Sequence, residues 1–378
     1  MLGAVLGGCS DSGAVLPPVT DPIALTPPPG FASGDVLVVS SEGTTESLAV
    51  LSLDPATGQV GLLAGSPANV GVQISDAETL AADPARRRIF FGSNLTRRIA
   101  VLDLDGAGRP VPVFGSPFLA QFQPVSVIKV SPAGDMIYVG YHDHSTISRY
   151  SVDAAGALTL AQSIVTPSGN HVETMLQVGD VLYVGFETTS NIVGFQLDAQ
   201  GAFVVNGMGD PTEVAVVSTN IRPDYLVAIA DKLYCSLAQA GSVDAFQIEA
   251  SGALTRLAGS PYAFPGMGLF ELITVQPGGA LIAVGGERPT ATVGLYTVNG
   301  DGTLTPAGAP LAMHERGGGP EGMVFSADGR FLYVSDHIGQ GLYVFEVTGN
   351  TIDFAATPRY MLPGRQIDVI RLALNVNP

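Results

Sequence analysis

The sequence predicts an all-β fold, a seven-bladed β-propeller made of four-stranded antiparallel blades. An apolar run, a glycine turn and a second apolar run recur in units of about 48 residues, and four-stranded units of roughly 40 to 50 residues are typical of propellers. The 378 residues include 47 glycines and 27 prolines, which favour short strands and tight turns over long helices. The runs are apolar on both faces, as in sheets that pack between neighbouring sheets.

The clearest copy of the repeat is Gly319–Asp336, in which Gly329 separates two apolar runs. Each unit is expected to contain four strands, A to D, with the glycine turn between A and B. The B strands are predicted at 36–39, 89–92, 136–139, 181–184, 233–236, 281–284 and 331–334. The C strands are predicted at 48–53, 99–104, 147–152, 192–197, 243–248, 293–298 and 342–347.

The two ends of the repeat region complement each other. The first B run has no A strand before it, and residues 368–375 form an A strand with no B strand after it. Pairing of these strands would close the ring and remove two free sheet edges. Residues 34–378 are therefore predicted to form one propeller that is closed by its C-terminal strand.

The net charge of −17, from 17 basic and 34 acidic residues, limits the partners. Nucleic acid and anionic membrane surfaces repel a polyanion, so we expect neither as a partner. No window after the first few residues has the roughly 18 to 20 apolar residues that a spanning helix needs. The charge favours cations as ligands, or serves solubility, and we expect a monomer.

Residues 1–9 resemble the end of a bacterial lipoprotein signal. Leu6–Cys9 is similar to a lipobox, in which the cysteine is lipidated after cleavage, so Cys9 is the expected lipidation site. The segment lacks a basic start and is shorter than an apolar region of about 7 to 15 residues, as a truncated signal would be; an ordinary tail is the alternative. Residues 10–33 contain six prolines, which predict an extended tether. The other cysteine, Cys235, lies in an apolar run and is expected to be a buried free thiol.

The loops of the predicted propeller divide between two faces. The A–B and C–D turns, such as 54–58 and 198–201, are short and rich in Asp and Gly, and we assign them no function beyond turning the chain. The B–C and D–A loops lie on the other face, where loops commonly carry function. They hold all five histidines, which are His142, His144, His171, His314 and His337.

Alignment of the A strands on their first apolar residues places a carboxylate at one position in six of the seven blades. These residues are Glu78, Glu173, Asp224, Glu271, Glu321 and Asp368, and Ser126 occupies the position in the remaining blade. Because A strands are innermost, the carboxylates should ring the channel mouth, and Arg222, Arg316 and Arg365 precede three of them. Carboxylates this close require a cation, basic partners or raised pKa values.

Three roles are open for this ring. It can bind a divalent cation, with Glu78, Glu173, Glu271 and Glu321 as the natural ligands and with Ca²⁺ favoured over Mg²⁺ or Zn²⁺ because it tolerates irregular oxygen geometry. The carboxylates can instead accept hydrogen bonds from neighbouring A-strand N–H groups and lock adjacent blades together. The third role is catalytic.

Two groups of polar residues near the mouth are further candidates. His142, Asp143 and His144 with His171 and Glu173 have the ligand types of a zinc-like site, although residues i and i+2 of a hairpin often point apart. His314, Arg316, Glu321, Asp336 and His337 suit acid/base chemistry on an ester, and equally the rim of a polar pocket. The candidate catalytic residues are His171, His314, Arg316, Glu321 and His337.

Several hairpins of the repeat resemble those of a known family. The hairpins at 53–60, 150–159, 246–261 and 296–305 are similar to those of seven-bladed lactonase-like propellers related to 6-phosphogluconolactonase, a group that includes YVTN-repeat proteins. Gly319–Asp336 is similar to that family's Gly-Pro-Arg-His, Phe, Asp-Gly, Tyr-Val pattern, and the segment around His171 partly resembles its histidine-containing mouth motif. The resemblance covers residue 34 to the C-terminus. Glu321 and Gly322 stand where the Arg-His pair is expected, which removes the groups that would hold a phosphate or carboxylate.

Two functional classes remain open. The first is an exported lactonase-like hydrolase, in which an ion or a basic group polarises a lactone carbonyl while a histidine or carboxylate activates water. The second is a non-catalytic, envelope-anchored propeller that binds a sugar-derived ligand, a cation or an envelope protein. The expected location is the bacterial periplasm or outer membrane, with membrane contact only through the lipid on Cys9, or otherwise the secreted fraction.

Overall fold

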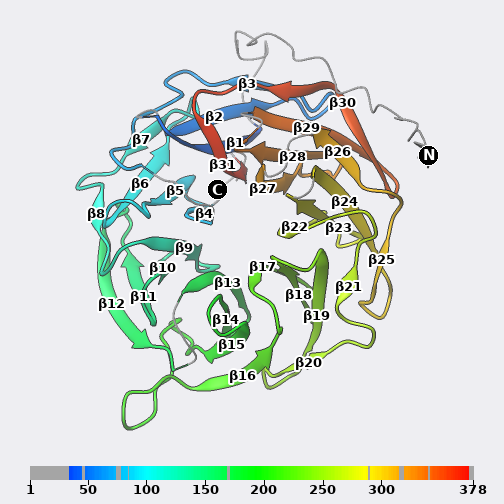
Figure 1. The fold of residues 1–378 in the computed structure, drawn as a ribbon. Coiled ribbons are helices and arrows are strands. Elements are labelled where there is room, and N and C mark those ends of the chain that lie inside the picture. The colour runs from blue at the N-terminus through cyan, green and yellow to red at the C-terminus, as the bar shows by residue number, and fades with distance from the viewer. Residues whose placement is uncertain are drawn as a thin grey trace, which may run out of the picture.

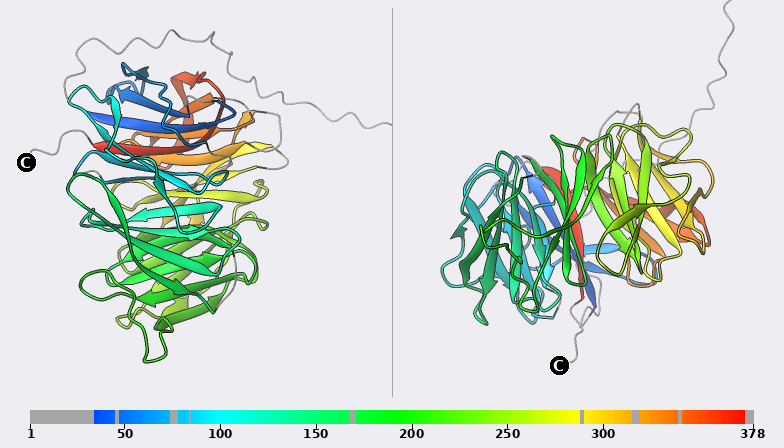
Figure 2. Two further views of the ribbon diagram at one scale, coloured as in Figure 1. Left: turned by 90° about the vertical axis from the view of Figure 1, so that its left-hand side faces the viewer. Right: turned by 90° about the horizontal axis from the view of Figure 1, so that it is seen from below.

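The computed structural model describes residues 34–44, 47–73, 78–83, 85–167, 171–287, 290–314, 319–338 and 341–373. Their strands form seven β-sheets arranged as blades around one axis (Figure 1). In the side view of Figure 2, neighbouring sheets lie face to face. The described residues form strands, turns and loops without a helix, so they include no helix that is long and apolar enough to cross a membrane. The predicted seven-bladed propeller is confirmed.

The blades are numbered from the first strand of the chain. The innermost (A) strands of blades 2 to 7 and then 1 are β4 (Leu80–Asp83), β9 (Val125–Val130), β13 (Val172–Val178), β17 (Pro223–Ile229), β22 (Phe270–Val275), β27 (Pro320–Phe325) and β31 (Arg365–Ala373). The B strands of blades 1 to 7 are β1 (Asp35–Glu42), β5 (Arg88–Gly92), β10 (Met136–Tyr141), β14 (Val181–Phe186), β18 (Lys232–Leu237), β23 (Leu281–Gly286) and β28 (Phe331–Asp336).

The C strands, in the same order, are β2 (Leu48–Leu53), β6 (Arg98–Leu104), β11 (Thr146–Val152), β15 (Asn191–Gln196), β19 (Ser242–Ile248), β24 (Ala291–Val298) and β29 (Gly341–Thr348). The outermost (D) strands are β3 (Val60–Leu62), β12 (Leu158–Val165), β16 (Glu213–Ser218) and β30 (Thr351–Tyr360), and in blades 2, 5 and 6 two short pieces share this edge: β7 (Pro110–Pro112) with β8 (Phe118–Leu119), β20 (Leu254–Arg256) with β21 (Tyr262–Ala263), and β25 (Leu304–Pro306) with β26 (Leu311–His314). All predicted B and C runs lie in these strands, apart from single residues at their ends.

The ring closes in blade 1, as predicted. β31 pairs antiparallel with β1 from Asp35 opposite Ala373 to Glu42 opposite Arg365. The last described strand of the chain is therefore the innermost strand of the first blade, so both ends contribute to one sheet.

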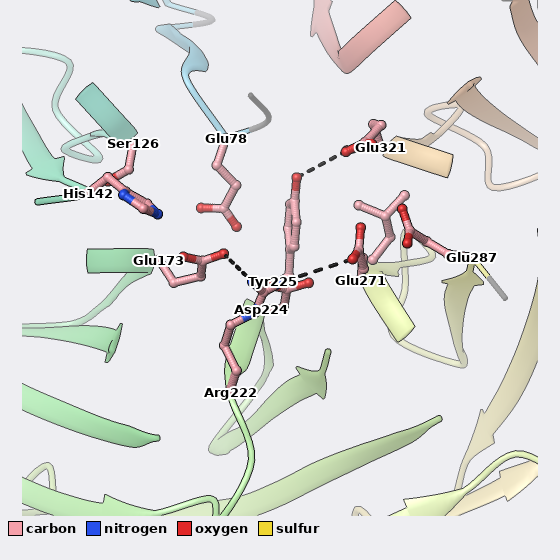
Figure 3. Close-up of a pocket in the computed structure, with 11 residues that line it drawn as sticks. Glu78, Ser126, His142, Glu173, Arg222, Asp224, Tyr225, Glu271, Glu287 and Glu321 are labelled. Carbon is pink, nitrogen blue, oxygen red and sulfur yellow. Dashed lines mark hydrogen bonds and ion pairs between the residues drawn. The ribbon is translucent and has the colours of Figure 1, made fainter. Parts of the chain in front are cut away.

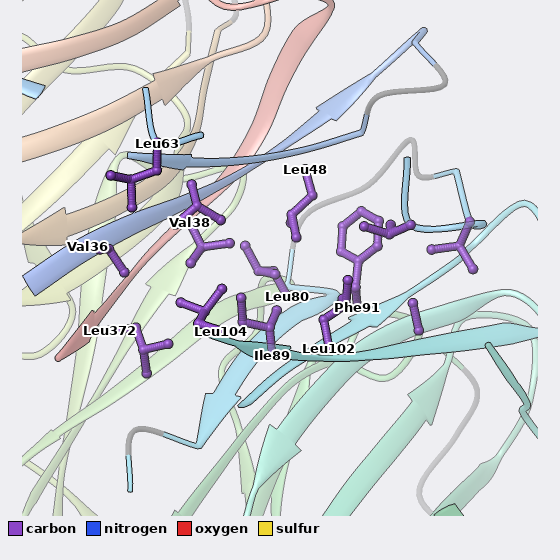
Figure 4. Packing of buried hydrophobic residues seen from close by; sticks show 14 of the residues in the cluster. Val36, Val38, Leu48, Leu63, Leu80, Ile89, Phe91, Leu102, Leu104 and Leu372 are labelled. Atoms are coloured by element: carbon purple, nitrogen blue, oxygen red, sulfur yellow. The ribbon is translucent and has the colours of Figure 1, made fainter. Parts of the chain in front are cut away.

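The core lies between blades rather than within one sheet. In the cluster between blades 1 and 2, Val38 and Leu48 pack with Ile89 and Phe91, and all four side chains are fully buried (Figure 4). The same kind of apolar layer recurs around the ring. This packing explains why the B and C runs are apolar on both faces. Cys235 lies in such a layer, fully buried and free, as expected.

The C–D turns, besides turning the chain, hold adjacent blades together. In four blades, the B-strand tyrosine donates its hydroxyl to the backbone carbonyl of the turn glycine in the next blade: Tyr138 to Gly201, Tyr183 to Gly252, Tyr234 to Gly302 and Tyr333 to Gly58, at 2.8 to 3.1 Å. These glycines have positive φ, and a Cβ on Gly201 would lie 2.6 Å from the Cε atom of Met136. Glycine is required there for conformation and for close approach.

Candidate functional site

The site lies at the mouth of the propeller, where the A strands begin. In blades 3, 4, 6 and 7 the pairing between A and B strands shifts register at this point, so Ser126, Glu173, Glu271 and Glu321 each sit at a β-bulge. A bulge leaves one residue unpaired and redirects its side chain. Here the redirected side chains line a cavity of about 320 Å³ together with Glu78, His142, Arg222, Asp224, Tyr225, Leu272 and Glu287 (Figure 3).

The register corrects one member of the predicted ring. Ser40 pairs with Asp368 and Ser41 with Gln366, so the bulge residue of blade 1 is Ile367. Asp368 lies one residue further along the strand, where blade 7 has Gly322. Five carboxylates therefore share the position, and Asp368 approaches the channel below them.

Arg222 is the central cation of the mouth. Its guanidinium lies 3.2 Å from the carboxylate of Glu187 and 3.0 Å from that of Asp224, with Glu173 at 3.8 Å and Glu271 at 3.9 Å. Burial lowers the pKa of Arg222, but the charges of Asp224 and Glu173 and the bond to Glu187 outweigh it and raise the pKa. Burial also raises the pKa of Asp224, and Arg222 offsets part of this shift. The expected role of Arg222 as a pairing base agrees with this geometry.

On one side of the mouth, three carboxylates come from the last two complete blades. Single oxygen atoms of Glu271, Glu287 and Glu321 all lie within 4.8 Å of one another (Figure 3). Burial, followed by the charge of Glu287, raises the pKa of Glu271 to about 9. Behind this cluster, Nδ1 of His337 lies 3.1 Å from Oε1 of Glu321, and this contact raises the pKa of His337. The cluster can share a proton or hold a cation.

Deeper in the channel, Lys129 and two buried carboxylates interact. Lys129 lies 3.2 Å from Oε2 of Glu78, whose Oε1 accepts a hydrogen bond from Thr174 at 2.9 Å. Asp368 accepts hydrogen bonds from its neighbour Val369 and from the backbone of Leu80 in the adjacent blade. Burial raises the pKa of Glu78 and of Asp368 to about 7, and Lys129 offsets part of both shifts.

The predicted calcium ligands do not form one shell. Glu271 and Glu321 lie together with Glu287, whereas Glu173 groups with His142 and Glu187, and Glu78 is held by Lys129 and Thr174. The carboxylates come from different blades around the mouth, and the side chain of Tyr225 lies between them (Figure 3). They therefore form separate groups rather than one ring. The Tyr225 hydroxyl donates to the backbone carbonyl of Glu321 at 3.1 Å.

On the other side of the mouth, His142 and His171 face each other from blades 3 and 4. Their ring centroids are 4.1 Å apart. Nδ1 of His171 lies 2.8 Å from Oε2 of Glu187, and Nδ1 of His142 lies 3.0 Å from Oδ1 of Asp143. His144 points away from this group, as residues i and i+2 of a hairpin often do, and its ring stacks on Phe122 at 4.3 Å.

The predicted catalytic group of the last blades separates into two pairs. His314 is 8% exposed, and its Nε2 lies 2.6 Å from Oδ2 of the fully buried Asp336, which makes it a supporting pair behind the mouth. His337 contacts Glu321 at the mouth. Arg316 and Cys9 lie outside the described residues. Arg365 pairs with Glu42 at 3.3 Å, away from the carboxylates of the cavity.

The sequence analysis did not identify Glu187 and Glu287 as residues of the site. Both follow a B strand, two residues after a small residue that packs against the next A strand. At this position the seven blades carry Glu42, Asn94, His142, Glu187, Ala238, Glu287 and His337. Alignment of the B-strand ends would have revealed this second set of mostly polar residues.

The lining determines which ligands the cavity accepts. Among the described residues that line it, six side chains are carboxylates, and the guanidinium of Arg222 is shared among four of the surrounding acids. Leu272 is the single aliphatic side chain of this described lining. An anionic ligand would be repelled, whereas hydroxyl groups and cations find many acceptors.

Comparisons with known proteins agree with the fold. The periplasmic gluconolactonase PpgL of Pseudomonas aeruginosa superposes with a TM-score of 0.73 at 19% identity, over 90% of this chain and 100% of that one. Candidate 6-phosphogluconolactonases from Bacteroides fragilis and Bacteroides uniformis give TM-scores of 0.74 and 0.75 at 15% and 12% identity, over 91% and 90% of this chain and 99% and 100% of theirs. No family model and no curated protein sequence matches the chain. The fold is that of the lactonase-like seven-bladed propellers.

Proposed function

We propose that the protein hydrolyses an uncharged, hydroxyl-rich lactone at the mouth of the propeller. The observation that carries this proposal is the cavity lined by six carboxylates, Arg222 and His142. Carboxylates accept hydrogen bonds from sugar hydroxyls, and a volume of about 320 Å³ lies in the range of small-molecule sites. The same carboxylates repel phosphorylated or acidic sugar lactones.

The two sides of the mouth supply complementary groups. On the side of the mouth that holds His142 and His171, a basic group takes a proton from water. The water oxygen attacks the lactone carbonyl carbon at the same time. The Arg222 guanidinium and the carboxylic acid of Glu271 face the negative charge that develops on oxygen. The tetrahedral intermediate then collapses, the bond from the carbonyl carbon to the ring oxygen breaks, and Glu271 donates its proton to that oxygen. The product is the open hydroxy acid.

The raised pKa of Glu271 supports this acid role, because a buried carboxyl beside Glu287 retains its proton near neutral pH. The group can then donate where an ionised carboxylate cannot. After each turnover the Glu271 carboxylate takes up a proton from solvent, and the acceptor on the histidine side releases one, which restores both groups.

The test is a panel of uncharged sugar lactones and their phosphorylated counterparts. Wild-type protein is expected to exceed the spontaneous rate only with uncharged lactones. Glu271→Gln should lower kcat on the order of 100-fold, since a positioned general acid contributes at least that much. Glu249→Gln, in an exposed C–D turn, is the matched control and should behave as wild type. Folded wild-type protein without activity on any uncharged lactone, or with a preference for the phosphorylated ones, contradicts the proposal.

A second candidate is cation binding without catalysis, which the cluster of Glu271, Glu287 and Glu321 favours. Oxygen ligands in irregular geometry suit Ca²⁺ better than Mg²⁺. Binding to the folded state raises Tm with cation concentration, and Glu287→Gln should weaken that rise. A Tm that responds neither to Ca²⁺ nor to chelator excludes this candidate.

We also propose a location in the bacterial envelope, with lipid on Cys9 and residues 10–33 as a tether for a monomeric propeller. The lipobox-like Leu6–Cys9 and the prolines support this proposal, and one similar protein is described as periplasmic. With its complete native signal, the protein should partition into detergent, and Cys9→Ser should abolish the partitioning. Equal partitioning of both forms would leave Cys9 as an ordinary tail residue.

A further inference from the structure

The pair of histidines at the mouth has the composition of a metal site rather than of an acidic patch. His142 follows β10 in blade 3, and His171 precedes β13 in blade 4 with a φ of 62°. A positive φ is uncommon for a residue with a side chain and persists only where surrounding contacts hold it. Here the conformation brings the two imidazoles to a centroid distance of 4.1 Å.

One carboxylate faces a nitrogen of each ring. Oδ1 of Asp143 lies 3.0 Å from Nδ1 of His142 and 3.6 Å from Nε2 of His171. Neighbouring ligand atoms on a tetrahedral ion with bonds near 2.0 to 2.1 Å are about 3.3 Å apart. The two distances bracket that value, and one ligand atom from each of the three residues lies within 4.8 Å of the other two.

We propose that His142, His171 and Asp143 bind a zinc-type divalent ion at the rim of the mouth. The ligand atoms are Nδ1 of His142, Nε2 of His171 and a carboxylate oxygen of Asp143. Two imidazoles and one carboxylate favour Zn²⁺ or Co²⁺ over Ca²⁺. Asp143 is 62% exposed, which leaves the remaining coordination position open to water, as in catalytic rather than structural zinc sites.

The second nitrogen of His171 is oriented as such a site requires. Histidine ligands of metals usually donate their other ring N–H to a carboxylate, which fixes the ring orientation. Nδ1 of His171 lies 2.8 Å from Oε2 of Glu187, and Glu187 is in turn held by Arg222 at 3.2 Å. Glu187 and Arg222 are thus positioning residues for the ion site, and neither was apparent in this role from the order of residues in the chain.

The proposal is independent of the proposed hydrolysis, because ion binding can be measured without a substrate. Metal-depleted full-length protein is titrated with Zn²⁺ by calorimetry and with Co²⁺ by visible absorption, which reports nitrogen and oxygen ligation directly. Wild type should bind one equivalent at this site. His171→Gln and Asp143→Asn should lose it, and Glu187→Gln should weaken it about 10-fold or more, as is typical for the carboxylate behind a ligand histidine.

Two variants serve as controls. His144→Gln changes the neighbouring histidine that stacks on Phe122, and Glu321→Gln changes the opposite carboxylate cluster; both should bind as wild type. The proposal is overturned if wild type gives no Co²⁺ absorption band, or if His171→Gln binds as tightly as wild type. Ion binding without lactone hydrolysis would contradict only the proposed hydrolysis, and hydrolysis by a protein that binds no ion would contradict only the ion site.

Discussion

The buried carboxylates Glu78 and Asp368 illustrate how the channel handles its negative charge. They are 6% exposed each, and Lys129 is their nearby cation. One ammonium cannot compensate two carboxylates that have been removed from water, so protonation becomes favourable near neutral pH. Partial protonation of these two carboxylates reduces the repulsion expected from a ring of acids.

The pH dependence of stability follows with a definite sign. Burial raises the folded-state pKa of Glu78 to about 7, above its ordinary value of 4.5, so between these values the folded state binds more protons than the unfolded state. The free energy of unfolding should therefore fall as pH rises from about 5 to 8, by at most roughly 3 kcal/mol for this group. Urea unfolding in the presence of chelator measures the change.

Glu78→Gln should reduce this pH dependence, because the amide does not titrate, while Asp368 retains its own contribution. The exposed Glu346→Gln in β29 is the control and should retain the wild-type slope. Wild-type stability that rises over the same pH range, with Glu78→Gln unchanged, contradicts the raised pKa.

Arg222 should be the most sensitive cation of the mouth. Its replacement in Arg222→Met leaves Asp224, 4% exposed, without its closest cation, and loss of one partner of a buried ion pair costs about 3 to 5 kcal/mol. Arg365→Met breaks only the more exposed pair with Glu42 and should cost about 0 to 1 kcal/mol. Chemical denaturation compares them, and equal costs would show that Arg222 is not the organising cation. Adding Asp224→Asn to Arg222→Met should recover part of the lost stability.

At the scale of elements, hydrogen bonds from B-strand tyrosine hydroxyls to the C–D turns join neighbouring blades repeatedly around the ring. Tyr138→Phe, Tyr183→Phe and Tyr234→Phe should each lower the free energy of unfolding by about 1 kcal/mol, since each leaves a carbonyl without its hydroxyl donor. Tyr262→Phe removes an exposed bond to Ala258 within one blade and should have little effect. Thermal unfolding tests the set. If all four variants lose the same stability, the bonds between blades have no special role.

The elements were predictable because each B and C run has an unambiguous apolar pattern. The direction of the side chains at the beginning of each A strand was harder to predict. A bulge adds one residue to the strand, and an alignment on apolar positions cannot locate that residue. Glu173, Glu271 and Glu321 were placed correctly, whereas Asp368 was displaced by one residue because Ile367 occupies the bulge. The tyrosine bonds were missed because each joins residues more than 60 positions apart.

At the scale of the whole molecule, the site is produced by convergence of blades. Arg222 in blade 5 reaches carboxylates of blades 4, 5 and 6, and His142 of blade 3 meets His171 of blade 4. The sequence indicated that these residues lie on the same face of the propeller, because the order of the strands determines on which face each loop lies. It could not indicate which of them touch, since those contacts depend on the curvature of the ring and on bulges.

Closure of the ring is what makes this convergence possible, and it gives the last prediction. β31 supplies the innermost strand of blade 1, and its Val369 and Leu372 pack into the cores on both sides of that blade. Deletion of 367–378 should therefore abolish cooperative unfolding, because blade 1 loses its inner strand and β1 becomes a free edge. Deletion of 374–378 retains the described strand and should unfold as the full chain does. Because the mouth is defined by all seven blades, the longer deletion should also abolish Co²⁺ binding by His142 and His171, although both residues remain in the chain. A longer deletion that melts cooperatively and still binds Co²⁺ would show that six blades hold the mouth without closure.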